Sequence, residues 1–229
     1  METDVQASEG LSFDLAAVQD LLALGGPVVV LLVVLSIAGL SIAFLKLLQF
    51  RRAHVWRTAP VAGAVAAYRA GDIEAANARL AAEESALART VAVATNSHPA
   101  RTRATTRELT EITAAAEIES LRGGLRPLEF IAAVSPLLGL FGTVLGMIAA
   151  FQALEAAGDR VDPSVLAGGI WEALFTTAAG LAVAIPALAL SNWFERTLDG
   201  LAHRMEHYGG LALTAQPPVD LRPAVMAAE

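Results

Sequence analysis

The 229-residue sequence contains no cysteine, and only 17% of its residues are charged. Without cysteine the chain has no disulfide framework, no thiolate metal site and no thiol nucleophile. Its net charge of -7 argues against a broad nucleic-acid-binding surface. Hydrophobic residues make up 55% of the chain and are gathered in blocks. This content is too apolar for an ordinary soluble domain of this size.

Three of these apolar blocks are long enough to cross a bilayer, which takes about 20 residues. The sequence therefore predicts an all-α integral membrane protein with three transmembrane helices and long cytoplasmic helical extensions. The predicted segments, in chain order, are an N-terminal segment (1–26), the first span (27–50), a cytoplasmic helical domain (51–126), the second span (127–154), a short loop (155–165), the third span (166–194) and a C-terminal segment (195–229).

Basic residues are distributed unevenly around these spans. Residues 1–26 contain none, whereas residues 51–126 contain eleven arginines. Of the 16 basic residues, all but Arg160 fall on one side of the predicted membrane. Because Lys and Arg favour the cytoplasmic side, we expect a periplasmic N-terminus and a cytoplasmic C-terminus in a bacterial inner membrane.

The predicted cytoplasmic segments are rich in good helix formers. We expect a helix over 64–95 that is interrupted near Gly71, with Asp72 capping the helix that follows. A second amphipathic helix over 100–124 should end at its paired glycines. The third span should extend as far as Gly209–Gly210, followed by a disordered tail. Residues 11–26, which are acidic and partly amphipathic, fit a short helix on the periplasmic surface.

One carboxylate, Glu172, lies inside the third span. At 1.5 Å per residue it sits about 9 Å below the predicted start of that span. An ionisable group at this depth is costly and faces either a bundle interior or a water-filled path. Glu172 is therefore either an interfacial acid that reaches the headgroups or a proton-binding group. No Lys, Arg or His lies in the interior of any span, so a second proton carrier should come from another chain.

Threonines and small residues accompany this acid. Thr143 and Thr177 fall in one predicted layer below Glu172, at depths of about 12 and 16 Å. Their hydroxyls could bridge water or carbonyl groups across helices, although a bond to the residue's own helix is the commoner alternative. Thr176 shares the helix face of Glu172. The residues predicted to shape close helix packing are Gly139, Gly142, Gly146, Gly180, Pro136 and Pro186.

Two stretches carry a family resemblance. "SPLLGLFGTVLGMIAAF" followed by "WEALFTTAAGLAVAIPALAL" resembles the MotA/TolQ/ExbB proton-channel family. Three spans with a large loop after the first are similar to the ExbB/TolQ branch rather than to MotA, which has four spans. By position, Glu172 matches the family's pore glutamate, and Thr143 and Thr177 match its polar threonines. Thr176 falls where the family often has Ala.

The resemblance implies a proton-driven complex in the inner membrane. It implies a homopentamer around the single transmembrane helices of an ExbD- or TolR-like partner, with an aspartate of that partner as proton carrier. The output would pass to a TonB- or TolA-like protein for outer-membrane transport or envelope integrity. The chain would also contact membrane lipid. The resemblance implies neither a cofactor nor a nucleic-acid partner.

Other interpretations stay open at this stage. The chain could be a membrane scaffold that conducts nothing, or a flagellar-stator-like channel for H⁺ or Na⁺. A membrane enzyme is the third alternative, because His203 and His207 share a helix face and could touch a metal. No third ligand stands near them in sequence, and the chain shows no nucleophile constellation or phosphate loop. We therefore expect neither a metal site nor catalysis.

Overall fold

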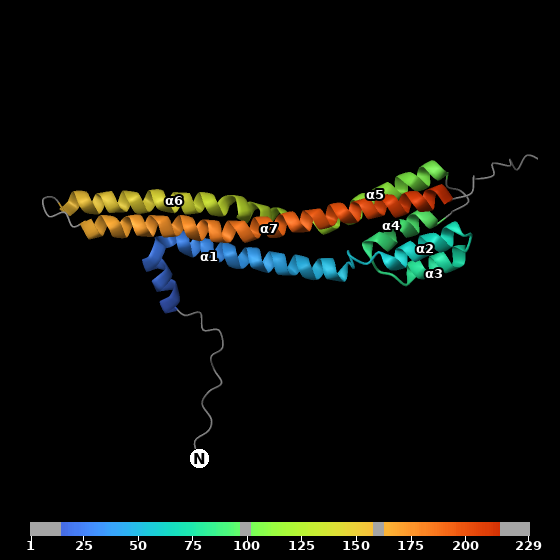
Figure 1. The fold of residues 1–229 in the computed structure, drawn as a ribbon, viewed down its shortest axis with the longest axis horizontal. Coiled ribbons are helices and arrows are strands. Elements are labelled where there is room, and N and C mark those ends of the chain that lie inside the picture. Colours follow the sequence, from blue (N-terminus) through green and yellow to red (C-terminus); the bar gives the residue numbers. More distant parts are fainter. Residues whose placement is uncertain (1–14, 97–101, 158–162, 216–229) are drawn as a thin grey trace, which may run out of the picture. The chain divides into compact units, whose positions relative to one another are not determined.

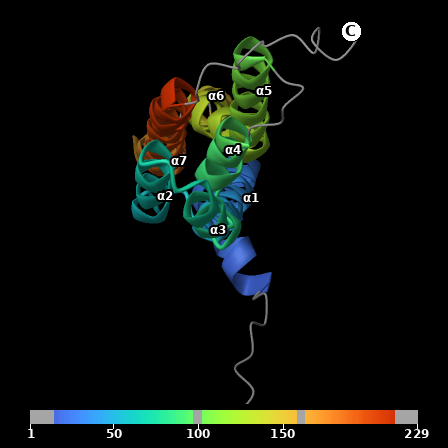
Figure 2. The same cartoon turned by 90° about the vertical axis from the view of Figure 1, so that its right-hand side faces the viewer.

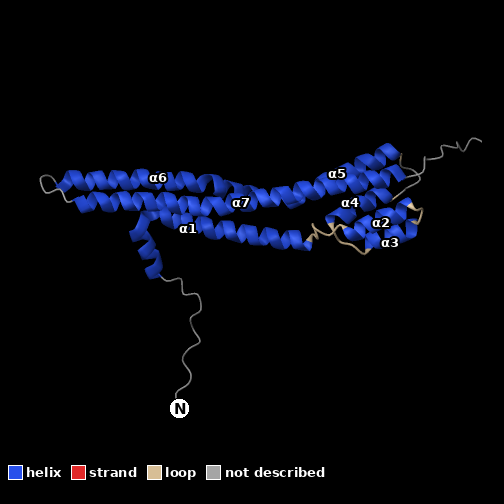
Figure 3. Ribbon diagram, viewed as in Figure 1, coloured by secondary structure: helices blue, strands red, loops and turns tan. Residues whose placement is uncertain are grey.

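The computed structural model describes residues 15–96, 102–157 and 163–215, and every element in these ranges is an α-helix (Figures 1 and 3). This confirms the predicted all-α class. The chain divides into two compact units. We call residues 1–43 with 126–191 the span unit, and residues 44–125 with 192–229 the head unit. The helices are α1 (Leu15–Arg52), α2 (Ala59–Arg69), α3 (Ile73–Ala81), α4 (Ala86–Thr95), α5 (Arg103–Arg122), α6 (Arg126–Ala157) and α7 (Pro163–Ala215).

Three of these helices contain apolar stretches that are long enough to cross a membrane, which confirms the predicted number of spans. The stretches are Gly26–Arg52, Arg126–Ala156 and the long helix Pro163–Ala215. Helix α1 begins at Leu15, earlier than the predicted span, because residues 15–25 are also helical. Figure 1 shows this first part, in dark blue, turned away from the line of the rest of α1.

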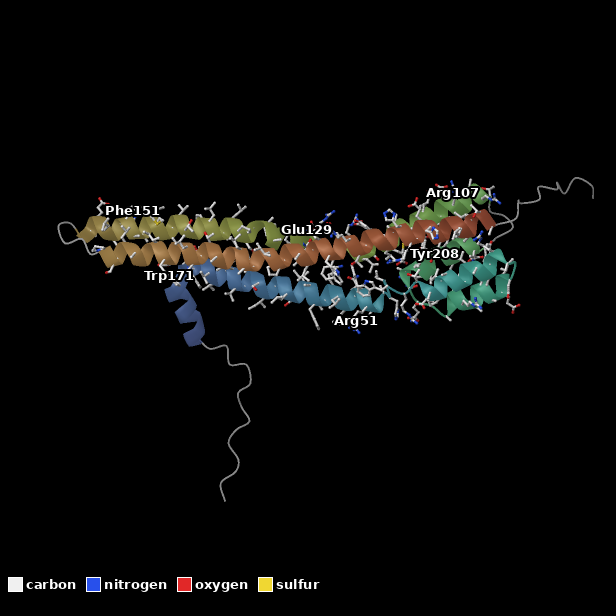
Figure 4. The ribbon with its side chains drawn as sticks, viewed as in Figure 1. Arg51, Arg107, Glu129, Phe151, Trp171 and Tyr208 are labelled. Atoms are coloured by element: carbon white, nitrogen blue, oxygen red, sulfur yellow. The ribbon has the colours of Figure 1, made fainter. Side chains whose placement is uncertain are left out.

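Within the span unit, small residues lie between helices and large apolar residues point outward. Gly39 of α1 faces α6, and a methyl group placed there would make an ordinary van der Waals contact, 3.7 Å from the Ile131 side chain. Figure 4 labels two of the outward aromatic side chains, Phe151 on α6 and Trp171 on α7. The other exposed large side chains of these two helices include Phe130, Leu137, Leu140, Phe141, Val144, Ile148, Leu174, Leu181, Ile185 and Leu188. Such a surface suits lipid or other transmembrane helices.

The head unit has a core of larger side chains. Helices α2, α3 and α4 group together in both views (Figures 1 and 2). Phe50 and Phe194 meet edge to face with ring centroids 5.2 Å apart. The other large, fully buried side chains of this unit include Val55, Val61, Leu87, Val91, Leu125, Leu198, Leu201 and Met205.

Side-chain caps divide the predicted cytoplasmic helix into three. Asp72 caps α3 as predicted, since its carboxylate accepts a hydrogen bond from the Ala75 N–H at 3.0 Å. A second break, which the sequence analysis missed, follows Ala81. There Ser85 takes an extended conformation and its hydroxyl accepts from the Ala88 N–H at 3.1 Å. The two predicted helices, divided at Gly71, therefore become three, α2, α3 and α4.

The end of α5 follows the prediction and the end of α7 does not. Helix α5 stops at Arg122, with Gly123 as its C-cap and Gly124 at φ +83°. Helix α7, however, continues through Gly209–Gly210 to Ala215, so the predicted end at these glycines is wrong. Gly209 is buried, and a methyl group there would lie 3.3 Å from Thr110 Cγ2 of α5. This close packing outweighs the low helix propensity of glycine. The predicted disordered tail lies outside the described residues.

Candidate functional site

Helices α6 and α7 meet along a line of small residues, which we call the seam. A methyl group placed at Gly180 would lie only 2.6 Å from the backbone oxygen of Ser135. One at Gly139 would lie 2.9 Å from the backbone oxygen of Thr176, and one at Gly142 2.8 Å from the Thr176 side chain. The seam therefore leaves space for hydrogen atoms only, as in the small-residue interfaces of transmembrane helices.

The seam continues toward the C-terminal end of α6 and the N-terminal end of α7. Gly146 faces Ala173, and Gly169 faces Ala150. Gly146 was predicted from the sequence to shape helix packing, whereas Gly169 and Ala173 of α7 were not predicted. Their spacing of four residues, followed by Thr176 and Gly180, is a small-residue stripe that could have been found in the sequence.

Thr176 belongs to the seam. Its side chain is 2% exposed, and its hydroxyl donates to the Ala173 backbone oxygen of its own helix at 2.7 Å. The Gly139 backbone oxygen is farther away, at 3.3 Å. A hydroxyl has a single proton, so the shorter bond is the one it donates. Thr176 thus packs against α6, and its hydroxyl bonds to backbone oxygen and not to the Glu172 carboxylate.

Thr177 and Thr143 are both half-buried, and their hydroxyls make different bonds. The Thr177 hydroxyl lies 3.3 Å from the Gly139 backbone oxygen across the seam. The Thr143 hydroxyl donates to Leu140 of its own helix at 2.7 Å. Thr143 follows Gly142, which faces Thr176, so both threonines occur near one level of the α6–α7 pair. No hydrogen bond joins them to each other among the described residues.

Glu172 lies near helix α1. Its side chain is half-buried, and its Oε1 atom lies 3.6 Å from the position of a methyl group placed at Gly26. Next to it Trp171 stacks on Phe175, with ring centroids 5.3 Å apart. In the part of the chain that the structure describes, no hydrogen bond or ion pair reaches the Glu172 carboxylate. This acid therefore stands in an apolar helix without a counter-charge from the described residues.

The one lysine of the chain is engaged elsewhere. Lys46, in the head unit, is buried, and its ammonium donates to the Leu121 backbone oxygen at 2.9 Å and to Gln49 Oε1 at 2.7 Å. A methyl group at Gly124 would lie 3.2 Å from Lys46 Cε, so the tight turn after α5 fits closely around this side chain. Lys46 thus binds the C-terminal end of α5, where a positive charge is stabilising.

His203 and His207, the pair weighed as metal ligands, lie on the exposed surface of α7. His203 Nδ1 lies 4.0 Å from Glu206 Oε2, with both side chains strongly exposed. The His207 ring meets Tyr208 edge to face. No group of three or more potential ligands occurs within 15–96, 102–157 and 163–215.

Comparison with known proteins accounts for this combination of a small-residue seam, an unpaired acid and three apolar helices. The sequence profile of the MotA/TolQ/ExbB proton channel family matches residues 72–207, more than half of the chain. The chain belongs to the MotA/TolQ/ExbB proton channel family. The match includes α3 to α6 and most of α7, and hence the whole seam and Glu172.

Individual relatives place it in the ExbB/TolQ branch. It is 48% identical over 88 residues to the biopolymer transport protein exbB1 of Vibrio cholerae, a match that covers 37% of this chain and 39% of that protein. It is 49% identical over 76 residues to the Tol-Pal system protein TolQ of Haemophilus influenzae, covering 33% of each chain. A putative ExbB homolog of Methanothermobacter thermautotrophicus is 40% identical over 90 residues, covering 39% of this chain and 31% of that protein. The chain thus matches about two fifths or less of each relative.

Proposed function

We propose that this chain is the ExbB/TolQ-like subunit of a proton-driven motor in the bacterial inner membrane. With an ExbD- or TolR-like single-span partner it would form a proton channel. The complex would energise a TonB- or TolA-like protein that spans the periplasm. Membership of the proton channel family supports this proposal, as do relatives named for biopolymer transport and for the Tol-Pal system.

The position of Glu172 carries the proposal. It is the one acid in the middle of an apolar stretch of α7, and no described residue neutralises it. An ionisable residue inside a span marks an ion or proton path and pairs with another polar group. Because the described part of the chain offers no such group, the partner subunit would supply it. Glu172 would then receive protons on the periplasmic side and pass them to an acid of the partner.

Thr143 and Thr177 would line the path below Glu172. Both are half-buried, and a hydroxyl that donates to a backbone carbonyl keeps its oxygen lone pairs as acceptors. These oxygens could therefore order water or receive a partner side chain. Thr176 would serve helix packing instead, since its hydroxyl is enclosed in the seam.

The assembly would be a ring, which we propose to be a homopentamer with periplasmic N-termini and cytoplasmic C-termini. The broad apolar surface of α6 and α7 supports further helix contacts within the membrane. The eleven arginines of residues 51–126 support the orientation. One proton moved through 100 mV releases about 2.3 kcal/mol, so a large mechanical output would need several protons, which suits a symmetric ring.

Proton flux into liposomes that contain this chain and its single-span partner tests the proposal. We expect Glu172→Gln to assemble normally, as judged by the mass of the complex, and to lower the flux at least about tenfold, because the amide cannot carry the proton. Glu155→Gln, which neutralises an exposed acid at the end of α6, is the matched control and should leave the flux unchanged.

Full flux in the assembled Glu172→Gln complex would refute the role of this acid. Flux that is absent even from the wild-type complex, with correct mass, would favour a scaffold over a motor channel. Flux that needs both the partner and Glu172 is the outcome that we predict.

A further inference from the structure

Helix α1 contains an elbow at Gly26. This residue has φ +61°, in the left-handed region that glycine adopts at no steric cost. Pro27 follows it, and proline disfavours the ordinary helical conformation in the residue before it. The sequence pair therefore explains why residues 15–25, which we call the arm, turn away from the rest of α1 in Figure 1.

The helix is held firmly on one side of the elbow. Val28, Val29 and Leu32 are buried in the span unit directly after Pro27. The elbow is thus the point at which α1 leaves the packed bundle and the arm begins. A change of backbone conformation at Gly26 would move the arm and the elbow itself, while the buried valines keep the rest of α1 in place.

The Glu172 carboxylate lies directly against this elbow. A methyl group at Gly26 would lie 3.6 Å from Glu172 Oε1, and it would meet no other atom within 4 Å outside its chain neighbours and its own helix backbone. The backbone of α1 at Gly26 therefore lies beside the carboxylate and makes no hydrogen bond to it. Movement of the elbow would change how much water reaches this acid.

We propose that Gly26 is a positioning residue for Glu172 and that the elbow limits access of water to its carboxylate. This inference rests on the proposed function, because Glu172 is the proposed entry to the proton path. In the sequence, residues 1–25, which precede the elbow, contain five acidic residues and no basic one.

The absence of cysteine allows a direct test that does not depend on proton conduction. A Glu172→Cys variant of the complex, in a nanodisc that opens both faces to a water-soluble maleimide, reports how accessible position 172 is. Adding Gly26→Ala strains the left-handed elbow. We expect it to raise the labelling rate about fivefold, the factor that corresponds to about 1 kcal/mol. Gly26→Asn should raise it less, because asparagine tolerates this conformation better.

Two controls separate positioning from general loosening. Gly71→Ala removes another glycine with positive φ, at +89°, where a methyl group meets nothing within 4 Å. It should leave the labelling rate at position 172 unchanged. A Val165→Cys variant, at a side chain that is 45% exposed on the same helix, should label equally with and without Gly26→Ala.

The proposal is overturned if Gly26→Ala leaves the rate at position 172 unchanged, or if it raises the rates at positions 172 and 165 alike. If labelling responds as expected while the wild-type complex conducts no protons, the positioning role stands and the proposed function fails. The two proposals are thus distinguishable by experiment.

Discussion

The span unit and the head unit are both made of packed helices, but different side chains hold them together. In the seam of the span unit the contacts are made by glycine, alanine, serine and threonine. In the head unit, fully buried phenylalanine, leucine, valine and methionine side chains pack together with buried alanines. Many of the large apolar side chains of α6 and α7 in the span unit point outward instead.

The difference follows from the surroundings of each unit. In water, burial of apolar surface drives helices together at about 25 cal/mol per Å². In lipid this driving force is missing, and close backbone approach supplies the contacts instead. Enlarging a seam residue should therefore be the most harmful change in one unit, and truncating a core residue the most harmful change in the other.

The largest effect is expected from Gly180→Val. Its side chain would lie 2.6 Å from the Ser135 backbone oxygen, and backbone atoms cannot move aside without separating α6 from α7. We expect loss of the assembled complex, measured as the yield of correct mass after detergent extraction. Gly168→Val is the matched control on the same helix, since a methyl group there meets nothing within 4 Å. Equal yields from both variants would contradict the close packing of the seam.

A smaller but clear effect is expected from Leu87→Ala in the head unit. Leu87 is 1% exposed, and truncating a buried leucine lowers the free energy of unfolding by about 2–5 kcal/mol. Ile112→Ala, at a side chain that is 58% exposed, should change it by less than about 0.5 kcal/mol. Thermal unfolding of the purified full-length protein compares the two. Similar shifts for both variants would mean that this core contributes little.

Much of this contrast could be predicted from the sequence. A long apolar block predicts a membrane span without any knowledge of the helices packed around it. The helix cap at Asp72 is likewise a signal within a few neighbouring residues. The glycines of α6 were also found, because a GxxxG spacing depends on one helix alone. What could not be predicted is which residue faces which. Thr176 and Glu172 share a helix face in the sequence pattern, yet the first packs against α6 and the second lies near Gly26 of α1.

Three features of the helices were not predicted. Two of them depend on contacts between distant parts of the sequence, and the third is a local cap. The continuation of α7 through Gly209 depends on the packing of α5 at Thr110, about a hundred residues away. The break at Ser85 is a local cap in a run of good helix formers, where the high propensity of the flanking alanines concealed it. Burial of Lys46 was equally invisible, since its partner is a backbone oxygen of another helix.

A third experiment sharpens the comparison at Lys46, a charged residue that is buried in the head unit. Lys46→Met removes a hydrogen bond from an ammonium to the Leu121 backbone oxygen. Bonds to charged groups contribute about 1.5–3 kcal/mol, so we expect a loss of that order in denaturant unfolding. Arg51→Met, an exposed position in the last turn of the same helix, should have little effect. Equal losses from the two variants would show that charge alone matters.

The smallest effect is expected at the surface of the head unit. Arg89 and Glu117 are joined by two hydrogen bonds of 2.6 Å, with side chains 50% and 18% exposed. The bond with Glu117 raises the pKa of Arg89, so the guanidinium stays charged at any pH suited to the experiment. Because solvent screens the pair, a double-mutant cycle of Arg89→Met and Glu117→Gln should give at most about 1 kcal/mol. A coupling well above this value, insensitive to salt, would contradict the expectation.

The tightness of the seam has a consequence for the cell that makes this protein. A water molecule needs a space of about one 1.4 Å sphere, and the contacts at Gly139, Gly142 and Gly180 leave none between α6 and α7. Protons hop along chains of water, so a newly inserted subunit offers them no route through its own seam. Under the proposed function, unassembled copies in an energised membrane would therefore not discharge it through this seam, and the proton path would lie where chains meet.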